Sequence, residues 1–179
     1  YMVAYWEFGF QEDHAQAMID EVRKKGAQVV VLLSHNGMDV DLKLASRVTG
    51  LDAIMGGHTH DGMPVATVVK NKSGQTLVTN AGSNGKFLAV MDFEVKNKRV
   101  TDFRYKLLPV FANILPADPA MQALIDKVRA PYAAKLSEQL AVTEDTLYRR
   151  GNFNGSGDQL IVDALMEVLD AEIAFSPGF

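Results

Sequence analysis

Two strand-like segments joined by a short helical pattern constrain the fold of this chain most strongly. Residues 28–33 form a continuous apolar, β-branched run, which is typical of a strand buried in a parallel sheet. Residues 51–55 have the character of a second buried strand, and residues 39–48 between them suit a crossover helix. Strand, helix and strand within about 30 residues is the spacing of a βαβ unit. The sequence therefore predicts an α/β fold built around a parallel sheet.

Histidines stand just beyond both predicted strands. His35 follows the first strand, and His58 and His60 follow the second after a pair of glycines. In an open α/β sheet the loops beyond the carboxyl ends of the strands gather in one crevice, where ligands bind. Neutral imidazole is the commonest metal ligand in proteins, so we expect the three histidines to converge on a metal centre. The alternative is a polar turn whose histidines face solvent.

Polar neighbours of these histidines are candidates for supporting the ligands or contacting a substrate. They are Asn36, Asp39, Thr59 and Asp61. Asp61 is placed to orient an imidazole as an outer carboxylate. Asp39 is also a candidate cap of the helix at 39–48, whereas Asp41 is expected on a solvated face. His14 lies in an acidic stretch and is expected at an exposed helix position.

Elsewhere the patterns predict helices and antiparallel strands in two groups. Before residue 109 we expect a helix over 11–25, a hairpin with strands over 65–70 and 75–80, and a second antiparallel pair over 86–95 and 99–107. After a proline-containing linker over 109–117 we expect a helix capped by Asp118 and running to about residue 139, and a short strand within 140–149. A Gly/Asn loop over 151–157, a helix capped by Asp158 and a last strand over 171–175 follow.

Composition narrows the function classes. The net charge is -4, and the scattered Lys and Arg residues form no long basic stripe of the kind that nucleic-acid binders carry. No apolar run reaches the roughly 20 residues that a membrane-spanning helix requires. Cysteine is absent, which excludes thiolate metal ligands and cysteine nucleophiles. We expect no partner among nucleic acids or membranes, and the oligomeric state is left open.

Three histidines do not complete a hydrolytic two-metal centre, which generally requires carboxylates as well. No cluster of acidic residues here clearly supplies them, and no catalytic residue beyond the metal ligands is identified. The chain opens at Tyr1 and stops at Phe179, directly after a strand-like segment. We therefore interpret it as an internal fragment whose acidic ligands lie upstream.

The motifs around the histidines resemble the last two metal-binding blocks of the calcineurin-like metallophosphoesterases, in their 5′-nucleotidase branch. The residues that carry the resemblance are Ser34 with His35 and the block of residues 56–61. The segments at 81–88 and 158–164 also resemble that branch. The resemblance implies the second half of the metal-binding αββα sandwich over 1–108, a linker and interdomain helix over 109–139, and the start of an α/β C-terminal domain over 140–179.

Within this branch the segments at 34–45, 56–62 and 169–179 most resemble the SoxB family of thiosulfohydrolases. The resemblance implies a periplasmic enzyme of sulfur oxidation that releases sulfate from a cysteine S-thiosulfonate on the carrier protein SoxYZ. It further implies two divalent metal ions, expected to be manganese. His35 and His58 would bind one ion, and His60 would bind the other.

Two other functions remain open at this point. One is a 5′-nucleotidase or related phosphoesterase, because the same metal centre serves phosphate esters. Nucleotidases commonly have an Asn-Gly-Gly turn where this chain has Ser176, Pro177 and Gly178, and this difference counts against a nucleotide pocket. The other is a non-catalytic module of the same fold that docks a partner protein.

Overall fold

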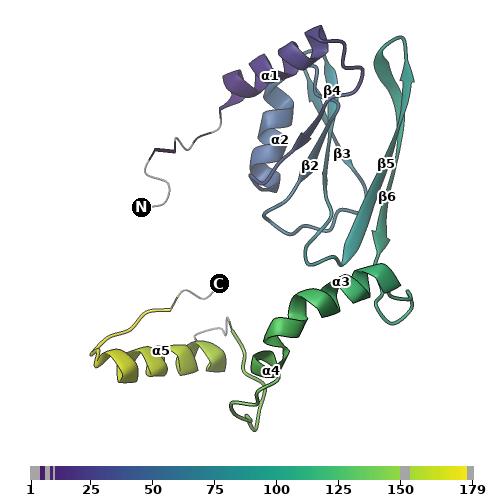
Figure 1. The fold of residues 1–179 in the computed structure, drawn as a ribbon. Coiled ribbons are helices and arrows are strands. Elements are labelled where there is room, and N and C mark those ends of the chain that lie inside the picture. The colour runs from purple at the N-terminus through teal and green to yellow at the C-terminus, as the bar shows by residue number, and fades with distance from the viewer. Residues whose placement is uncertain (1–4, 7–8, 10, 150–153, 177–179) are drawn as a thin grey trace. The chain divides into compact units, whose positions relative to one another are not determined.

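The computed structural model describes residues 5–6, 9, 11–149 and 154–176. It divides into two compact units, Tyr1–Ala117 and Asp118–Phe179. The architecture is mixed α/β, as the sequence predicts (Figure 1). Each unit has its own organisation.

The N-terminal unit is built on a four-stranded sheet with the order β1-β2-β4-β3. The strands β1, β2 and β4 are parallel, and β3 pairs antiparallel with β4. The predicted βαβ unit and both predicted antiparallel pairs are confirmed, and the second pair forms a separate two-stranded sheet. The elements in chain order are α1 (Glu12–Lys24), β1 (Val31–Leu33), α2 (Met38–Arg47), β2 (Ala53–Gly56), β3 (Thr67–Asn71), β4 (Gly74–Asn80), β5 (Phe87–Lys96) and β6 (Arg99–Pro109).

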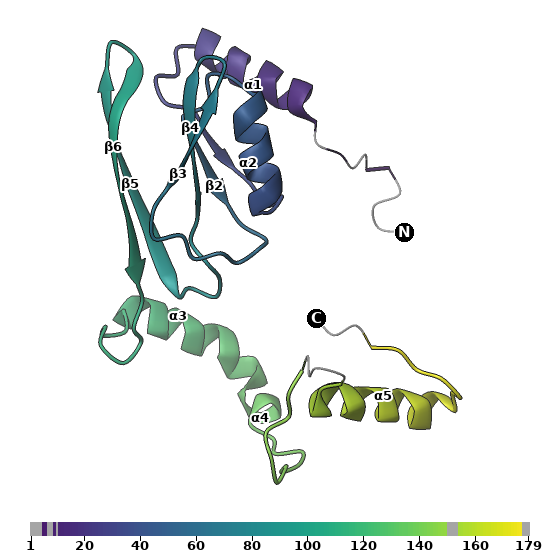
Figure 2. The same ribbon diagram turned by 180° about the vertical axis from the view of Figure 1, so that it is seen from behind.

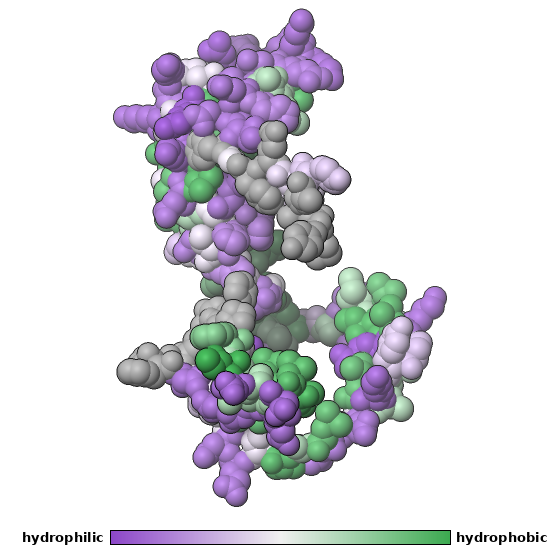
Figure 3. Space-filling view, turned by 90° about the vertical axis from the view of Figure 1, so that its left-hand side faces the viewer, coloured by the Kyte–Doolittle hydropathy of each residue, from purple (hydrophilic) through white to green (hydrophobic). Residues whose placement is uncertain are grey.

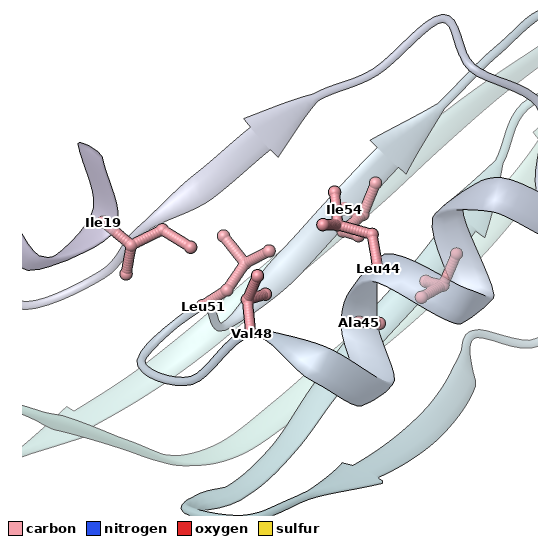
Figure 4. Close-up of a cluster of buried hydrophobic side chains, with 7 residues drawn as sticks. Ile19, Leu44, Ala45, Val48, Leu51 and Ile54 are labelled. Atoms are coloured by element: carbon pink, nitrogen blue, oxygen red, sulfur yellow. The ribbon is translucent and has the colours of Figure 1, made fainter. Parts of the chain in front are cut away.

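Alternating residues of β2 and β4 build cores on the two faces of this sheet. Ile54 pairs in register with Val78, and both are fully buried on the side of α1 and α2 (Figure 4). Their neighbours Ala53 and Leu77 face the opposite way, because successive side chains of a strand point to opposite faces. On that side the hairpin of β5 and β6 covers the sheet with Met91, Phe93, Phe103 and Tyr105 (Figure 2).

The C-terminal unit contains helices and connecting segments. Asp118 caps α3 (Pro119–Arg129), as predicted, by accepting a hydrogen bond from the Met121 N–H at 2.8 Å. The prediction of one continuous helix to about residue 139 is wrong, because Pro131 lacks an N–H to donate to the preceding turn. The chain passes instead through a 3-10 turn (η1, Ala130–Tyr132) into the short α4 (Ala133–Leu136).

The last helix also begins earlier than predicted. It is α5 (Ser156–Leu169), and its N-cap is Gly155 rather than Asp158. The strands predicted within 140–149 and 171–175 are not formed in the part of the chain that the structure describes. The apolar stripes of α3 and α5 are exposed, and Figure 3 shows hydrophobic residues on the surface of this unit. None of the helices within the described ranges is both long and apolar enough to cross a membrane.

Arg23, near the end of α1, ties this helix to the loops that lead into β1 and β2. Its guanidinium donates hydrogen bonds to the carbonyl oxygens of Gly50 at 2.9 Å and Gln28 at 2.8 Å. It also forms an ion pair with Asp52, whose carboxylate accepts a further hydrogen bond from the Val30 N–H at 2.7 Å. Both side chains are largely buried. This cluster ties the residues just before β1 and β2 to the end of α1.

We therefore expect Arg23→Ala to lower the free energy of unfolding by about 2–3 kcal/mol, because it removes charge-assisted hydrogen bonds and leaves Asp52 without its cation. Lys25→Ala is the matched control on the same helix end, since Lys25 pairs with the exposed Glu21 at 2.5 Å. It should cost less than about 0.5 kcal/mol. Urea unfolding of the two variants measures the difference, and equal losses would contradict the role given to Arg23.

Candidate metal centre

The rings of His35 and His58 meet at the carboxyl edge of the sheet. The parallel register of β1 and β2 brings the two following loops side by side. The ring centroids are 5.1 Å apart and the planes stand at 70°, in an edge-on arrangement. Gly57 leaves room for the His35 ring, because a Cβ there would stand 3.2 Å from the His35 Nδ1, a tight contact. Both imidazoles are exposed. Two nitrogen donors are thus placed where one ion could reach both.

His60 lies in the same loop as His58 but does not join the pair in a three-ligand group. Within the described ranges, no three His, Asp or Glu side chains lie close enough together to hold one ion. Of the three histidines expected to converge, the structure records a ring contact between His35 and His58. His58 and His60 both adopt left-handed backbone, with φ of 71° and 60°. Such conformations are uncommon outside glycine and concentrate at functional sites.

The Thr59 hydroxyl, between the two histidines, organises this loop. It donates to the Asp61 Oδ2 at 2.5 Å and accepts from the Met38 N–H at 3.4 Å. The buried Asn80, at the end of β4, donates to the same hydroxyl at 3.4 Å and to the Gly57 carbonyl oxygen at 3.3 Å. Asp61 therefore supports the loop through its hydrogen bond with Thr59. The expected contact of Asp61 with an imidazole is not among the hydrogen bonds of the described residues.

A surface groove opens beside the loop and gathers three of the four predicted supporting residues. Asp39, Thr59 and Asp61 line it together with Met38, Gly62, Met63, Pro64 and Val65. Asp39 does not cap α2, since the N-cap is Gly37 and no side chain caps it. Asn36 is exposed beside His35, and its N–H donates to the Ser34 Oγ at 3.2 Å.

Asp41 is fully buried, so the expectation of a solvated face is wrong. Its Oδ1 accepts a hydrogen bond from the Ser34 Oγ at 2.5 Å, and its Oδ2 is buried without a hydrogen-bond partner. Burial raises the pKa of the Asp41 carboxyl above its ordinary value, and the hydrogen bond from Ser34 opposes this rise. At the other extreme, His14 is exposed on α1, as predicted.

The loop predicted over 151–157 is wrong for Ser156 and Gly157, which lie in the first turn of α5, and residues 151–153 lie outside the described residues. The Gly157 N–H donates to the Tyr148 carbonyl oxygen at 2.8 Å, and the Ser156 Oγ accepts from the Tyr148 N–H at 3.0 Å. The Asp158 Oδ1 accepts from the Arg149 Nε at 2.5 Å. This helix start is therefore engaged by its own chain. Pro177 and Gly178, which bear on the nucleotide pocket, lie outside the described residues.

Sequence reasoning missed Asn80 and Asp41. Asn80 ends an apolar run and pairs in register with Gly56, so its position just after a third strand was the available signal. Asp41 carried no such signal, because an aspartate near the start of a helix is ordinarily solvated. Asp41 meets Ser34 because the loop between β1 and α2 places these two residues, seven positions apart, within hydrogen-bond distance.

Comparison with known proteins finds likenesses to a thiohydrolase, nucleotidases and phosphoesterases. The structure resembles a sulfate thiohydrolase SoxB from Thermus thermophilus with a TM-score of 0.72 and 35% identity, over 89% of this chain and 29% of that one. It resembles a 5′-nucleotidase precursor, also from Thermus thermophilus, with a TM-score of 0.77 and 26% identity, over 89% of this chain and 35% of that one. A trifunctional nucleotide phosphoesterase, YfkN of Bacillus subtilis, is 39% identical over 71 residues, which are 40% of this chain and 5% of that protein.

The chain spans between 5% and 38% of the length of the first curated relatives that it matches. No protein-family model matches it. The likenesses support the 5′-nucleotidase family of metallophosphoesterases, whose members are dimetal hydrolases, and the α/β fold matches that of the structural neighbours.

The left-handed backbone at His60 predicts that this loop lowers the free energy of unfolding. We expect His60→Gly to raise the free energy of unfolding of the metal-free protein by about 1 kcal/mol, because glycine adopts this conformation without steric cost. His60→Ala is the matched control, since it removes the imidazole but keeps a Cβ in the left-handed region. Thermal unfolding should separate the two variants, and an alanine variant as stable as the glycine variant would refute the explanation.

Asp41 predicts a pH dependence of stability. Between the ordinary pKa of an aspartate, about 3.9, and the raised pKa of Asp41, the folded state holds a proton that the unfolded state has lost. The contribution of Asp41 to stability therefore falls as pH rises through this window. We expect Asp41→Asn to gain stability relative to the wild type from about pH 4 upward. Urea unfolding over a pH series measures this, and a relative gain by the wild type would contradict it.

Proposed function

We propose that this chain, with the family support described above, supplies the imidazole ligands of a two-metal hydrolase. The observation that carries the proposal is the meeting of His35 and His58 at the ends of adjacent parallel strands, with ring centroids 5.1 Å apart. In this assignment His35 and His58 bind one ion and His60 binds the other. The described residues contain no group of three ligands for one ion, which is compatible with that division.

The residues present fit part of such a centre. Imidazole nitrogens suit divalent transition metals, and both rings of the pair are open to solvent. A two-metal site also needs carboxylates, and the described residues bring no third His, Asp or Glu to the pair. We propose that these carboxylates belong to segments that the longer relatives have and that this chain does not span. The bound metals would lower the pKa of a water and polarise the substrate's oxyanion.

We further propose that the reaction is release of sulfate from a cysteine S-thiosulfonate carried by SoxYZ, in the periplasm and with manganese. Support comes from the sequence blocks around His35 and His58, and from 35% identity to the sulfate thiohydrolase across most of this chain. The groove beside Thr59 combines apolar Met63, Pro64 and Val65 with two acidic side chains. Such a surface suits a peptide segment better than a polyanion.

A 5′-nucleotidase activity is the second candidate, and specific observations favour it. The nucleotidase neighbour has the higher TM-score, 0.77 against 0.72, and curated relatives that match most of the chain are 5′-nucleotidases. The two activities share the metal centre and differ in the group they release. A parallel assay of sulfate and phosphate release therefore separates them. A non-catalytic module would release neither.

The deciding experiment uses a polypeptide of the relatives' full length that contains this chain, loaded with manganese. It should release sulfate from a thiosulfonated carrier and little phosphate from nucleoside monophosphates. His58→Ala should reduce turnover by more than the roughly 10–100-fold that loss of an outer partner costs, because it removes a direct ligand. His14→Ala, the exposed histidine on α1, is the matched control and should leave turnover unchanged.

The isolated 179-residue chain should bind manganese weakly and release neither product. Rapid sulfate release by the isolated chain, or an unimpaired His58→Ala, would overturn the assignment of roles. Phosphate release in place of sulfate release would favour the nucleotidase.

A further inference from the structure

The buried carboxyl of Asp41 lies close to the ends of β1 and β2, the two strands that His35 and His58 follow. Asp41, in the first turns of α2, has no solvent exposure. Its Oδ1 accepts the hydrogen bond from Ser34, the residue that precedes His35. Ser34 is in turn held to β2, because its N–H donates to the Met55 carbonyl oxygen at 3.0 Å.

The other carboxyl oxygen of Asp41 lies against Gly56, two residues before His58. A Cβ at Gly56 would stand 2.5 Å from the Asp41 Oδ2 and 3.1 Å from the Thr79 carbonyl oxygen. Real Cβ atoms do not approach an oxygen so closely, so a glycine is required at this position. The carboxyl thus fills the space between the end of β1 and the end of β2.

This arrangement is costly for stability alone. The Oδ2 is buried with no hydrogen-bond partner, and buried polar groups in native proteins are rarely left so. Leu44 and Val48 lie buried in the hydrophobic core at the other end of the same helix, so an apolar residue would suit a purely structural role. An unsatisfied buried group in a native structure therefore calls for an explanation other than stability.

We infer that Asp41 is a positioning residue that braces the end of β1 against the end of β2 and so sets the separation of the His35 and His58 rings. Its carboxyl fixes Ser34, and thereby His35, on one side, while it limits the approach of Gly56 on the other. The consequence for metal binding rests on the proposed function. The consequence for the ring contact does not.

The experiment uses the 179-residue chain and has two readouts. One is the nuclear Overhauser contact between the ring protons of His35 and His58 in metal-free protein, and the other is the manganese affinity measured by calorimetry. Asp41→Leu keeps the same number and branching of side-chain heavy atoms but removes the acceptor, so it should abolish the ring contact and weaken binding by about tenfold or more. Asp41→Asn keeps an acceptor for Ser34 and should restore both readouts.

Leu44→Ala controls for loss of stability alone. Leu44 is 4% exposed in the core of the same helix, so this variant should unfold more easily yet keep the ring contact and the affinity. Ser34→Ala covers the case in which Asp41→Leu does not fold, since it removes the same hydrogen bond from a partly exposed residue. It should weaken the ring contact.

Each outcome decides the inference. An intact ring contact in Asp41→Leu or, where that variant does not fold, in Ser34→Ala overturns it. The inference is also overturned if Leu44→Ala loses the ring contact to the same extent as Asp41→Leu. A wild type that shows the ring contact but binds no manganese contradicts the proposed function, and the brace is then judged by the ring contact alone.

Discussion

The parallel pairing of β1, β2 and β4 is the constraint on which the candidate site depends. It aligns Val31 with Ala53 and Ile54 with Val78, so that all three strands end at one edge of the sheet. The loops that carry His35 and His58 then begin side by side, next to Asn80 at the end of β4. A shift of one residue in this register would turn Ile54 and Val78 away from the helices. The buried core and the position of the histidines are therefore set by the same pairing.

The loops at this edge are held by polar contacts that run across the strands. Asn80 supports the loop of His58 from β4, and Asp41 supports the strand ends from α2. Both side chains are buried, and two histidines nearby adopt left-handed backbone. A chain selected for stability alone would avoid buried polar atoms and such conformations. Among the described residues, the one buried side-chain polar atom without a hydrogen-bond partner, the Asp41 Oδ2, lies at this edge.

Much of this unit could be predicted from sequence because its patterns are local and strong. The run at 28–33, the helix over 39–48 and the turns at Asn71 and Asn97 each mark one element with the right period. The proximity of His35 and His58 followed from the rule for strand ends. The burial of Asp41 did not, because it depends on a partner seven residues away and on a glycine in another strand. The left-handed backbone at His58 and His60 was also not foreseen, because no side-chain pattern reports a backbone dihedral.

Predictions for the C-terminal unit were less successful for a different reason. The caps and stripes of α3 and α5 are local signals, and both helices form. The strands expected within 140–149 and 171–175 would need partners to pair with, and the described residues of this unit contain no strand. Pro131 interrupts the long helix because backbone hydrogen bonding outweighs the continuous apolar stripe.

The central claim is that the strand ends present His35 and His58 as a ligand pair for one metal ion. Anomalous diffraction at the manganese edge tests it most directly, from crystals of a metal-loaded polypeptide of the relatives' full length that contains this chain. We predict one peak within coordination distance of nitrogens on both rings, and a second peak bound by His60. A protein that takes up manganese with its peaks away from His35 and His58 would contradict the claim.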